Sequence, residues 1–159
     1  MSFSEIDGIS AEKGDNIFSS SAFSGRVVNS VKGEWMAESE NKLERLINLQ
    51  NGWDGGTARS VSFRNANFAM NVLGAVCDKG SPAPQFVPGT NGDLQIEWHL
   101  VGGSIELHIL KPNLVKAWYE VNNSDDEEGE QDLTNNFAIV SDWLKKILGA
   151  QGAADRNAA

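Results

Sequence analysis

The sequence contains little cysteine and no long apolar run. Its 159 residues include one cysteine, Cys77, so the chain cannot close a disulfide within itself. No stretch of about 18 consecutive apolar residues occurs, which predicts that no segment spans a membrane. The first residues show no basic segment followed by an apolar stretch, the pattern of a secretory signal. These absences together predict a cytoplasmic protein.

Basic residues are also scarce. Lysine and arginine total 13 against 22 aspartates and glutamates, which leaves a formal net charge of −9. A field of this sign repels nucleic acid, and no cluster of basic residues with aromatic neighbours is present to bind phosphates. The charge therefore favours a protein partner with a basic surface over direct nucleic-acid binding. The alternative is that it only keeps the protein soluble.

Alternating apolar and polar residues fill much of the segment from 84 to 121. Ile96, Trp98 and Leu100 alternate with Glu97 and His99, and successive side chains of a strand point to opposite faces. The runs at 104–110 and 114–121 alternate in the same way, and a shorter run that begins with proline stands at 84–88. The pattern predicts a meander of four antiparallel strands with one apolar and one polar face.

Two glycine-containing pairs, Asn91-Gly92 and Gly102-Gly103, are typical of two-residue hairpin turns. The second turn places Glu97 opposite His108 and His99 opposite Glu106. The first turn and a three-residue loop after residue 111 extend one of these pairs across the polar face. The predicted row is Phe86–Glu97–His108–Trp118, a mixture of aromatic and charged residues typical of interface hot spots.

Three stretches show the spacing of apolar residues expected for helices, at 34–51, 63–78 and 133–148. Ser62 is placed to cap the second helix, and Gly149 is placed to end the third. The prediction is an α+β fold, in which a four-stranded antiparallel meander sheet carries three helices on one face. A single domain would span 34–149, with a disordered, flexible N-terminal segment at 1–33 and a flexible tail at 150–159.

A glycine-rich loop between the first two helices contains the pair Trp53-Asp54. One interpretation is structural: Trp53 anchors the loop while Asp54 accepts hydrogen bonds from nearby backbone amides. The other is that a rigid loop presents Asp54 to a partner. No Lys-Ser or Lys-Thr follows the glycines, so the loop is not expected to bind phosphates.

An acidic segment follows the predicted sheet. It contains Asp125, Asp126, Glu127, Glu128 and Glu130. The spacing of a calcium-binding loop is absent. The segment is either a solvated loop or an electrostatic lure for a basic partner, and the second interpretation makes these residues candidates for partner binding.

The predicted hairpin gathers Glu97, His99, Glu106 and His108 on one face. Two imidazoles and two carboxylates suit a zinc ion or general acid–base chemistry, so a metal-dependent or Glu/His hydrolase is an alternative function. Side chains on a flat sheet project in parallel, however, and do not converge on an ion. We therefore expect no metal, no cofactor and no catalytic residues, and we count these four residues as candidates for partner binding.

Residues 43–121 resemble small bacterial accessory proteins with a Trp-Asp-Gly-x-Gly-Ala loop and a Gly-x-hydrophobic-x-Glu-Trp strand. The matching residues are Trp53, Asp54, Gly55, Ala58, Pro84, Gly92, Ile96, Glu97 and Trp98. The sequence departs from the pattern at Gly56 and Thr57. The relatives look like genes of phages and mobile elements, so the resemblance implies an antitoxin-like or anti-defence role.

These observations together predict an acidic inhibitor that neutralises a partner protein by covering its surface. Anti-CRISPR inhibitor and antitoxin are the two specific forms. A structural or assembly protein, pairing as a homodimer through an exposed sheet edge, is the remaining alternative.

Overall fold

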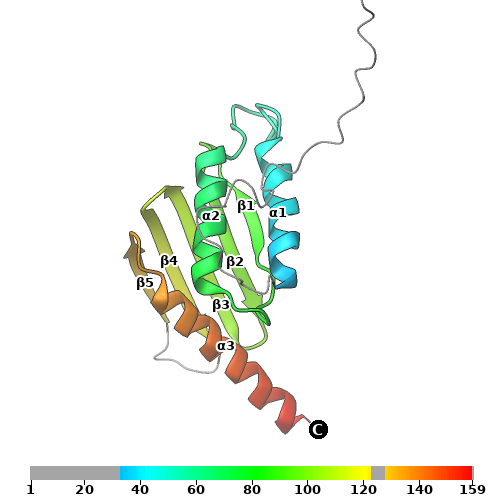
Figure 1. Cartoon of the computed structure of the whole chain (residues 1–159), viewed down its shortest axis with the longest axis vertical. Helices are drawn as coiled ribbons and strands as arrows, with labels where there is room; N and C mark the ends of the chain where they lie inside the picture. Colours follow the sequence, from blue (N-terminus) through cyan, green and yellow to red (C-terminus); the bar gives the residue numbers. More distant parts are fainter. Residues whose placement is uncertain (1–32, 123–127, 159) are drawn as a thin grey trace, which may run out of the picture.

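The computed structural model describes residues 33–122 and 128–158, which form one antiparallel sheet with three helices on one face (Figure 1). The elements in order are α1 (Glu34–Ile47), α2 (Phe63–Val76), β1 (Gln85–Pro88), β2 (Leu94–Leu100), β3 (Gly103–Lys111), β4 (Leu114–Val121), β5 (Glu128–Leu133) and α3 (Ala138–Asn157). The strands pair in chain order, so the sheet is a meander with β1 and β5 at its edges. Figure 1 shows α1 beside β1, α2 over the middle of the sheet and α3 across one end.

The predicted α+β class and the antiparallel meander are confirmed, but the sheet has five strands rather than four. The additional strand, β5, comes from the segment predicted as an acidic loop and pairs with β4. Its sequence, EGEQDL, contains a single apolar residue, Leu133, which is buried. The strand therefore rests on backbone pairing and on burial of Leu133, and it lacks the alternation that marked the other strands.

The three predicted helices are present with different ends. Ser62 caps α2 as predicted, because its Oγ accepts a hydrogen bond from the Asn65 amide at 3.1 Å. The first two helices end earlier than expected, at Ile47 and Val76, and α3 begins later, at Ala138.

Helix α3 also continues through Gly149 to Asn157, so Gly149 does not end the helix as predicted, and residues 150–157 of the predicted tail are helical. A helical glycine costs about 1 kcal/mol relative to alanine but keeps its backbone hydrogen bonds, so it weakens a helix without necessarily ending it. The predicted flexible N-terminal segment lies outside the described residues except for Gly33, which is buried at the start of α1.

The helices bury the apolar face of the sheet. The largest fully buried side chains are Trp98, Leu43, Leu73, Leu94, Ile96, Ile105, Leu107, Ile109, Leu144, Ile147 and Val61. The inward residues of β2 and β3 alternate with the outward ones as the sequence predicts. Burial of this apolar surface is the main favourable contribution to folding.

The β2–β3 register differs from the prediction by two residues. Trp98 lies opposite Ile105 rather than Leu107, and Glu97 lies opposite Glu106 rather than His108. The turn contains Val101 and Gly102, because Leu100 already pairs with Gly103. A shift of two leaves every side chain on its predicted face while changing its neighbour across the strands.

The two glycines of this turn are required by close packing. A Cβ on Gly102 would collide with the backbone oxygen of Ile147 in α3, and a Cβ on Gly103 would collide with the backbone oxygen of Glu120. Gly103 also has a positive φ of 152°. The pair Gly102-Gly103 therefore marks the contact of the sheet with α3 as well as a turn.

The β1–β2 register differs by one residue, which reverses the faces of β1. Phe86 lies opposite Ile96 rather than Glu97 and points to the helix side. Trp118 lies opposite Glu106 rather than His108. The predicted row Phe86–Glu97–His108–Trp118 is therefore wrong. The row that crosses the polar face is Gln85–Glu97–Glu106–Trp118–Glu130.

Candidate functional site

The side of the sheet away from the helices, here called the outer face, is strongly acidic. It carries the outward side chains of β2 to β5, and six of these are carboxylates. The carboxylates are Glu97, Glu106, Glu120, Glu128, Glu130 and Asp132. Lys116 lies among them, pairs with Glu130 at 4.0 Å and with Asp132 at 3.7 Å, and has a side chain that is 53% exposed. Long, exposed ion pairs of this kind contribute little to the free energy of folding.

Like charges lie directly opposite each other at two places on the outer face. Glu97 pairs with Glu106 across β2 and β3, and Glu120 pairs with Glu128 across β4 and β5. Directly opposite side chains of an antiparallel sheet have Cβ atoms about 5 Å apart, and like charges at this distance are destabilising. A cation placed over either pair would relieve the repulsion.

The two histidines have local carboxylate partners, and the predicted pairs Glu97–His108 and His99–Glu106 are wrong. His99 Nε2 lies 2.9 Å from Glu97 Oε2 within β2, and its Nδ1 lies 3.2 Å from Ser104 Oγ. His108 Nε2 lies 2.5 Å from Asp93 Oδ2.

His108 affects the pKa of the Asp93 carboxyl group. Partial burial raises the pKa of Asp93, but hydrogen bonds with His108 and with the Asn91 amide outweigh burial and hold the pKa below its ordinary value. His99 and His108 lie four rows apart on the sheet, roughly 13 Å at the usual rise per residue. No group of three or more His, Cys, Asp or Glu suited to a metal ion occurs in residues 33–122 and 128–158.

A small hollow on the outer face lies beside Trp118, and we call it the Trp118 pocket. Its volume is about 150 Å³. The lining residues are Gln95, Glu106, His108, Lys116, Ala117, Trp118 and Glu130. Residues from three neighbouring strands and the β5 edge therefore meet at one half-buried indole.

Trp53 and Asp54 belong to the loop that connects α1 with α2, at the upper end of these two helices in Figure 1. Trp53 donates its indole N–H to the Arg59 carbonyl at 2.9 Å. Asp54 Oδ1 accepts hydrogen bonds from the amides of Gly56 at 2.9 Å and Ala58 at 3.2 Å, and these bonds lower the pKa of Asp54. The contacts are those of the structural interpretation of this loop, although the Asp54 carboxylate stays exposed.

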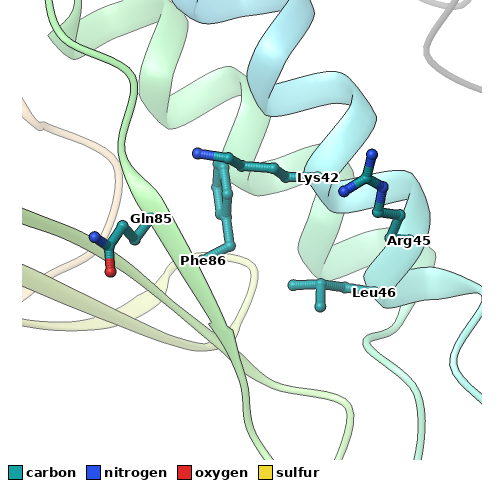
Figure 2. Close-up of a pocket in the computed structure, with 5 residues that line it drawn as sticks. All are labelled: Lys42, Arg45, Leu46, Gln85 and Phe86. Atoms are coloured by element: carbon teal, nitrogen blue, oxygen red, sulfur yellow. The ribbon is translucent and has the colours of Figure 1, made fainter.

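A second hollow, of about 340 Å³, lies between α1 and β1 and was not predicted from the sequence. Figure 2 shows its lining by Lys42, Arg45, Leu46, Gln85 and Phe86, with Phe86 directed toward Lys42 and Gln85 directed away from it. Lys42 Nζ donates to the Pro84 carbonyl at 3.1 Å and pairs with Glu38 at 2.6 Å. The only sequence signal for this hollow is the spacing of Lys42 and Arg45 on one side of a helix.

The acidic segment is only partly described. Asp125, Asp126 and Glu127 lie outside the described residues, whereas Glu128 and Glu130 are exposed on β5. The structure thus gathers seven of the predicted residues on or near the outer face: Glu97, His99, Glu106, His108, Trp118, Glu128 and Glu130. It places Trp53, Asp54 and Phe86 elsewhere.

No protein-family model matches this chain, no curated protein matches it, and no solved structure matches its fold. The resemblance to phage and mobile-element accessory proteins therefore stays a prediction. Among the described residues, no helix combines the length and the apolar character needed to cross a membrane.

Proposed function

We propose that the protein binds a basic surface of a partner protein through its outer face and inhibits that partner by covering it. The observation that carries the proposal is the pair of opposed glutamates, Glu97 with Glu106 and Glu120 with Glu128. Opposite charges at such positions would stabilise the sheet, whereas two carboxylates repel each other across the strands, even with His99 beside Glu97.

Charge and shape both support protein binding over small-molecule chemistry at this face. Lys116, which lies among the six outward carboxylates, forms only long ion pairs with them, so the local field is negative and attracts a basic surface. The Trp118 pocket, at about 150 Å³, is smaller than the 300–1,000 Å³ typical of small-molecule sites. A half-buried tryptophan among charged residues is a common anchor in protein interfaces.

The resemblance of residues 43–121 to accessory proteins of phages and mobile elements favours two forms of this inhibitor. In an anti-CRISPR or other anti-defence protein, the acidic face would occupy a basic groove that otherwise holds nucleic acid. In an antitoxin, it would cover the basic surface of a toxin. Both forms use the same surface chemistry.

The test is capture of the partner from cells of the source organism by the full-length protein and by two charge-matched variants. The first variant carries glutamine at Glu97, Glu106, Glu120 and Glu128. The second carries Glu34→Gln, Glu44→Gln, Asp142→Asn and Asp155→Asn, which remove the same charge from the helices.

We expect the first variant to lose the captured protein and the second to retain it, with binding by the unmodified protein falling as salt rises. Equal capture by both variants would refute the outer face as the binding surface. Equal loss of the captured protein by both variants would show that capture depends on net charge and not on the position of the glutamates.

A further inference from the structure

One tryptophan differs from the others in its contacts. Of the five tryptophans, three donate the indole N–H to a backbone carbonyl: Trp35 to Asp78, Trp53 to Arg59 and Trp98 to Pro82. Trp143 stacks on Tyr119 at a centroid distance of 4.3 Å. The side chain of Trp118 makes neither kind of contact with the described part of the chain, although it is half-buried. A large amphipathic side chain in this condition is suited to an external partner.

Two other side chains of the Trp118 pocket are also unpaired. Glu106 is half-buried, and its carboxylate forms no ion pair or side-chain hydrogen bond within residues 33–122 and 128–158. Gln95 is also half-buried, and its side-chain amide forms no hydrogen bond within the described residues. A carboxylate, an amide and an indole that have no partner in the described part of the chain thus line one hollow. A ligand that pairs such partly buried polar groups gains binding free energy.

The cross-strand register places Trp118 between two carboxylates. Glu106 lies directly opposite it on β3, and Glu130 lies directly opposite it on β5. Adjacent strands lie about 4.8 Å apart, so the indole stands with one carboxylate on each side. An aromatic face flanked by two negative charges attracts a planar cation.

We propose that the Trp118 pocket binds the side chain of a single arginine on the partner protein. This inference rests on the proposed function and names the residue that anchors it. A guanidinium stacks on an indole and donates hydrogen bonds from several edges at once, so it can pair Glu106 and Glu130 while lying on Trp118. A lysine ammonium offers a point charge without the planar face.

The other charged side chains that line the Trp118 pocket are compatible with a bound arginine. His108 is turned to Asp93 by a hydrogen bond of 2.5 Å. Lys116 is the one cationic side chain of the lining, and its contact with Glu130 is long, at 4.0 Å. Lys116 therefore competes with the arginine for Glu130, and its removal should tighten binding.

The experiment is an NMR titration of the full-length protein with Nα-acetyl-arginine amide, followed at the Trp118 indole N–H. Trp118→Phe assigns that signal, and the matching citrulline derivative is the uncharged control. We expect a saturable shift confined to the pocket, which citrulline does not produce. Trp118→Ala and Glu106→Gln should weaken binding about ten-fold, and Lys116→Gln should strengthen it several-fold. Glu34→Gln on α1 should leave it unchanged.

The arginine-binding proposal would be refuted if the citrulline derivative produced the same chemical-shift change. It would also be refuted if the changes spread over the whole acidic surface. Binding that survives Trp118→Ala would refute it as well, provided that an amide spectrum shows the variant to be folded. The two proposals fail separately. If partner capture depends on the outer-face glutamates but not on Trp118, the arginine pocket is refuted and the proposed function is supported. If arginine amide binds in the pocket but partner capture does not depend on the glutamates, the pocket is supported and the proposed function is refuted.

Discussion

The two faces of the same sheet are built from alternate residues of the same strands, yet they follow opposite rules. The covered face pairs apolar side chains beneath the helices, with Ile96 opposite Leu107 and Trp98 opposite Ile105. The outer face sets Glu97 against Glu106, and there the indole of Trp118 forms no hydrogen bond or ring stacking with the described part of the chain. The difference teaches that stability comes from one side of the sheet, so the other side is free to carry charges that serve binding.

The largest expected effect compares neighbouring residues of β3. Leu107→Ala removes a fully buried side chain and should lower the free energy of unfolding by about 2–5 kcal/mol. Glu106→Ala, one residue away on the outer face, should change it by less than about 1 kcal/mol. Urea denaturation of both variants measures the contrast, and comparable losses would contradict the division between the faces.

The next effect concerns the contact between α3 and the covered side. Gly102→Ala forces a Cβ against the Ile147 carbonyl and should lower the free energy of unfolding by about 1–3 kcal/mol. Gly149→Ala meets open space within α3 and should raise it by about 0.5–1 kcal/mol. Thermal melts should therefore shift in opposite directions. If Gly102→Ala stabilised the protein, the close approach of Gly102 to the Ile147 carbonyl would not be the reason that the turn requires glycine.

A smaller effect sharpens the division on the outer face itself. Glu106→Gln relieves the repulsion with Glu97 and should raise the free energy of unfolding by about 0.2–1 kcal/mol at low salt. The gain should shrink as salt screens the pair. The same variant should weaken partner binding, so that stability and function change in opposite directions. A loss of stability at low salt would show that the two carboxylates do not repel.

The smallest effect is a dependence on pH at the edge of the outer face. The pKa of Asp93 in the folded chain lies below its ordinary value of 3.8, so its ionised form stabilises the fold above that pH. The contribution should disappear as pH falls below 3.8. Asp93→Asn should therefore be less stable than the unmodified protein at pH 6, and the difference should narrow at pH 3. Parallel urea curves at the two pH values test this, and a constant difference would exclude the charged form as its source.

Part of the candidate site was within reach of sequence reasoning. The placement of Glu97, Glu106, His108 and Trp118 on one face follows from their alternation with apolar residues. Phe86 was assigned to that face wrongly, because the loop from Gly89 to Asp93 is longer than the two-residue turn that Asn91-Gly92 indicates. The α1–β1 hollow depends on two elements that are about 40 residues apart, and no local pattern connects them.

The α+β class, the covered face of the central strands and the acidity of the other face could all be predicted from the amino-acid sequence. These properties follow from the period of two along each strand and from composition, which are local. Three features became known from the three-dimensional fold: which carboxylates lie opposite each other, the fifth strand at Glu128–Leu133, and the position of Trp118 between Glu106 and Glu130. Local patterns do not reveal the pairing because a register shift of two residues leaves them unchanged. The choice between registers comes from contacts between distant segments, such as Gly102 against Ile147.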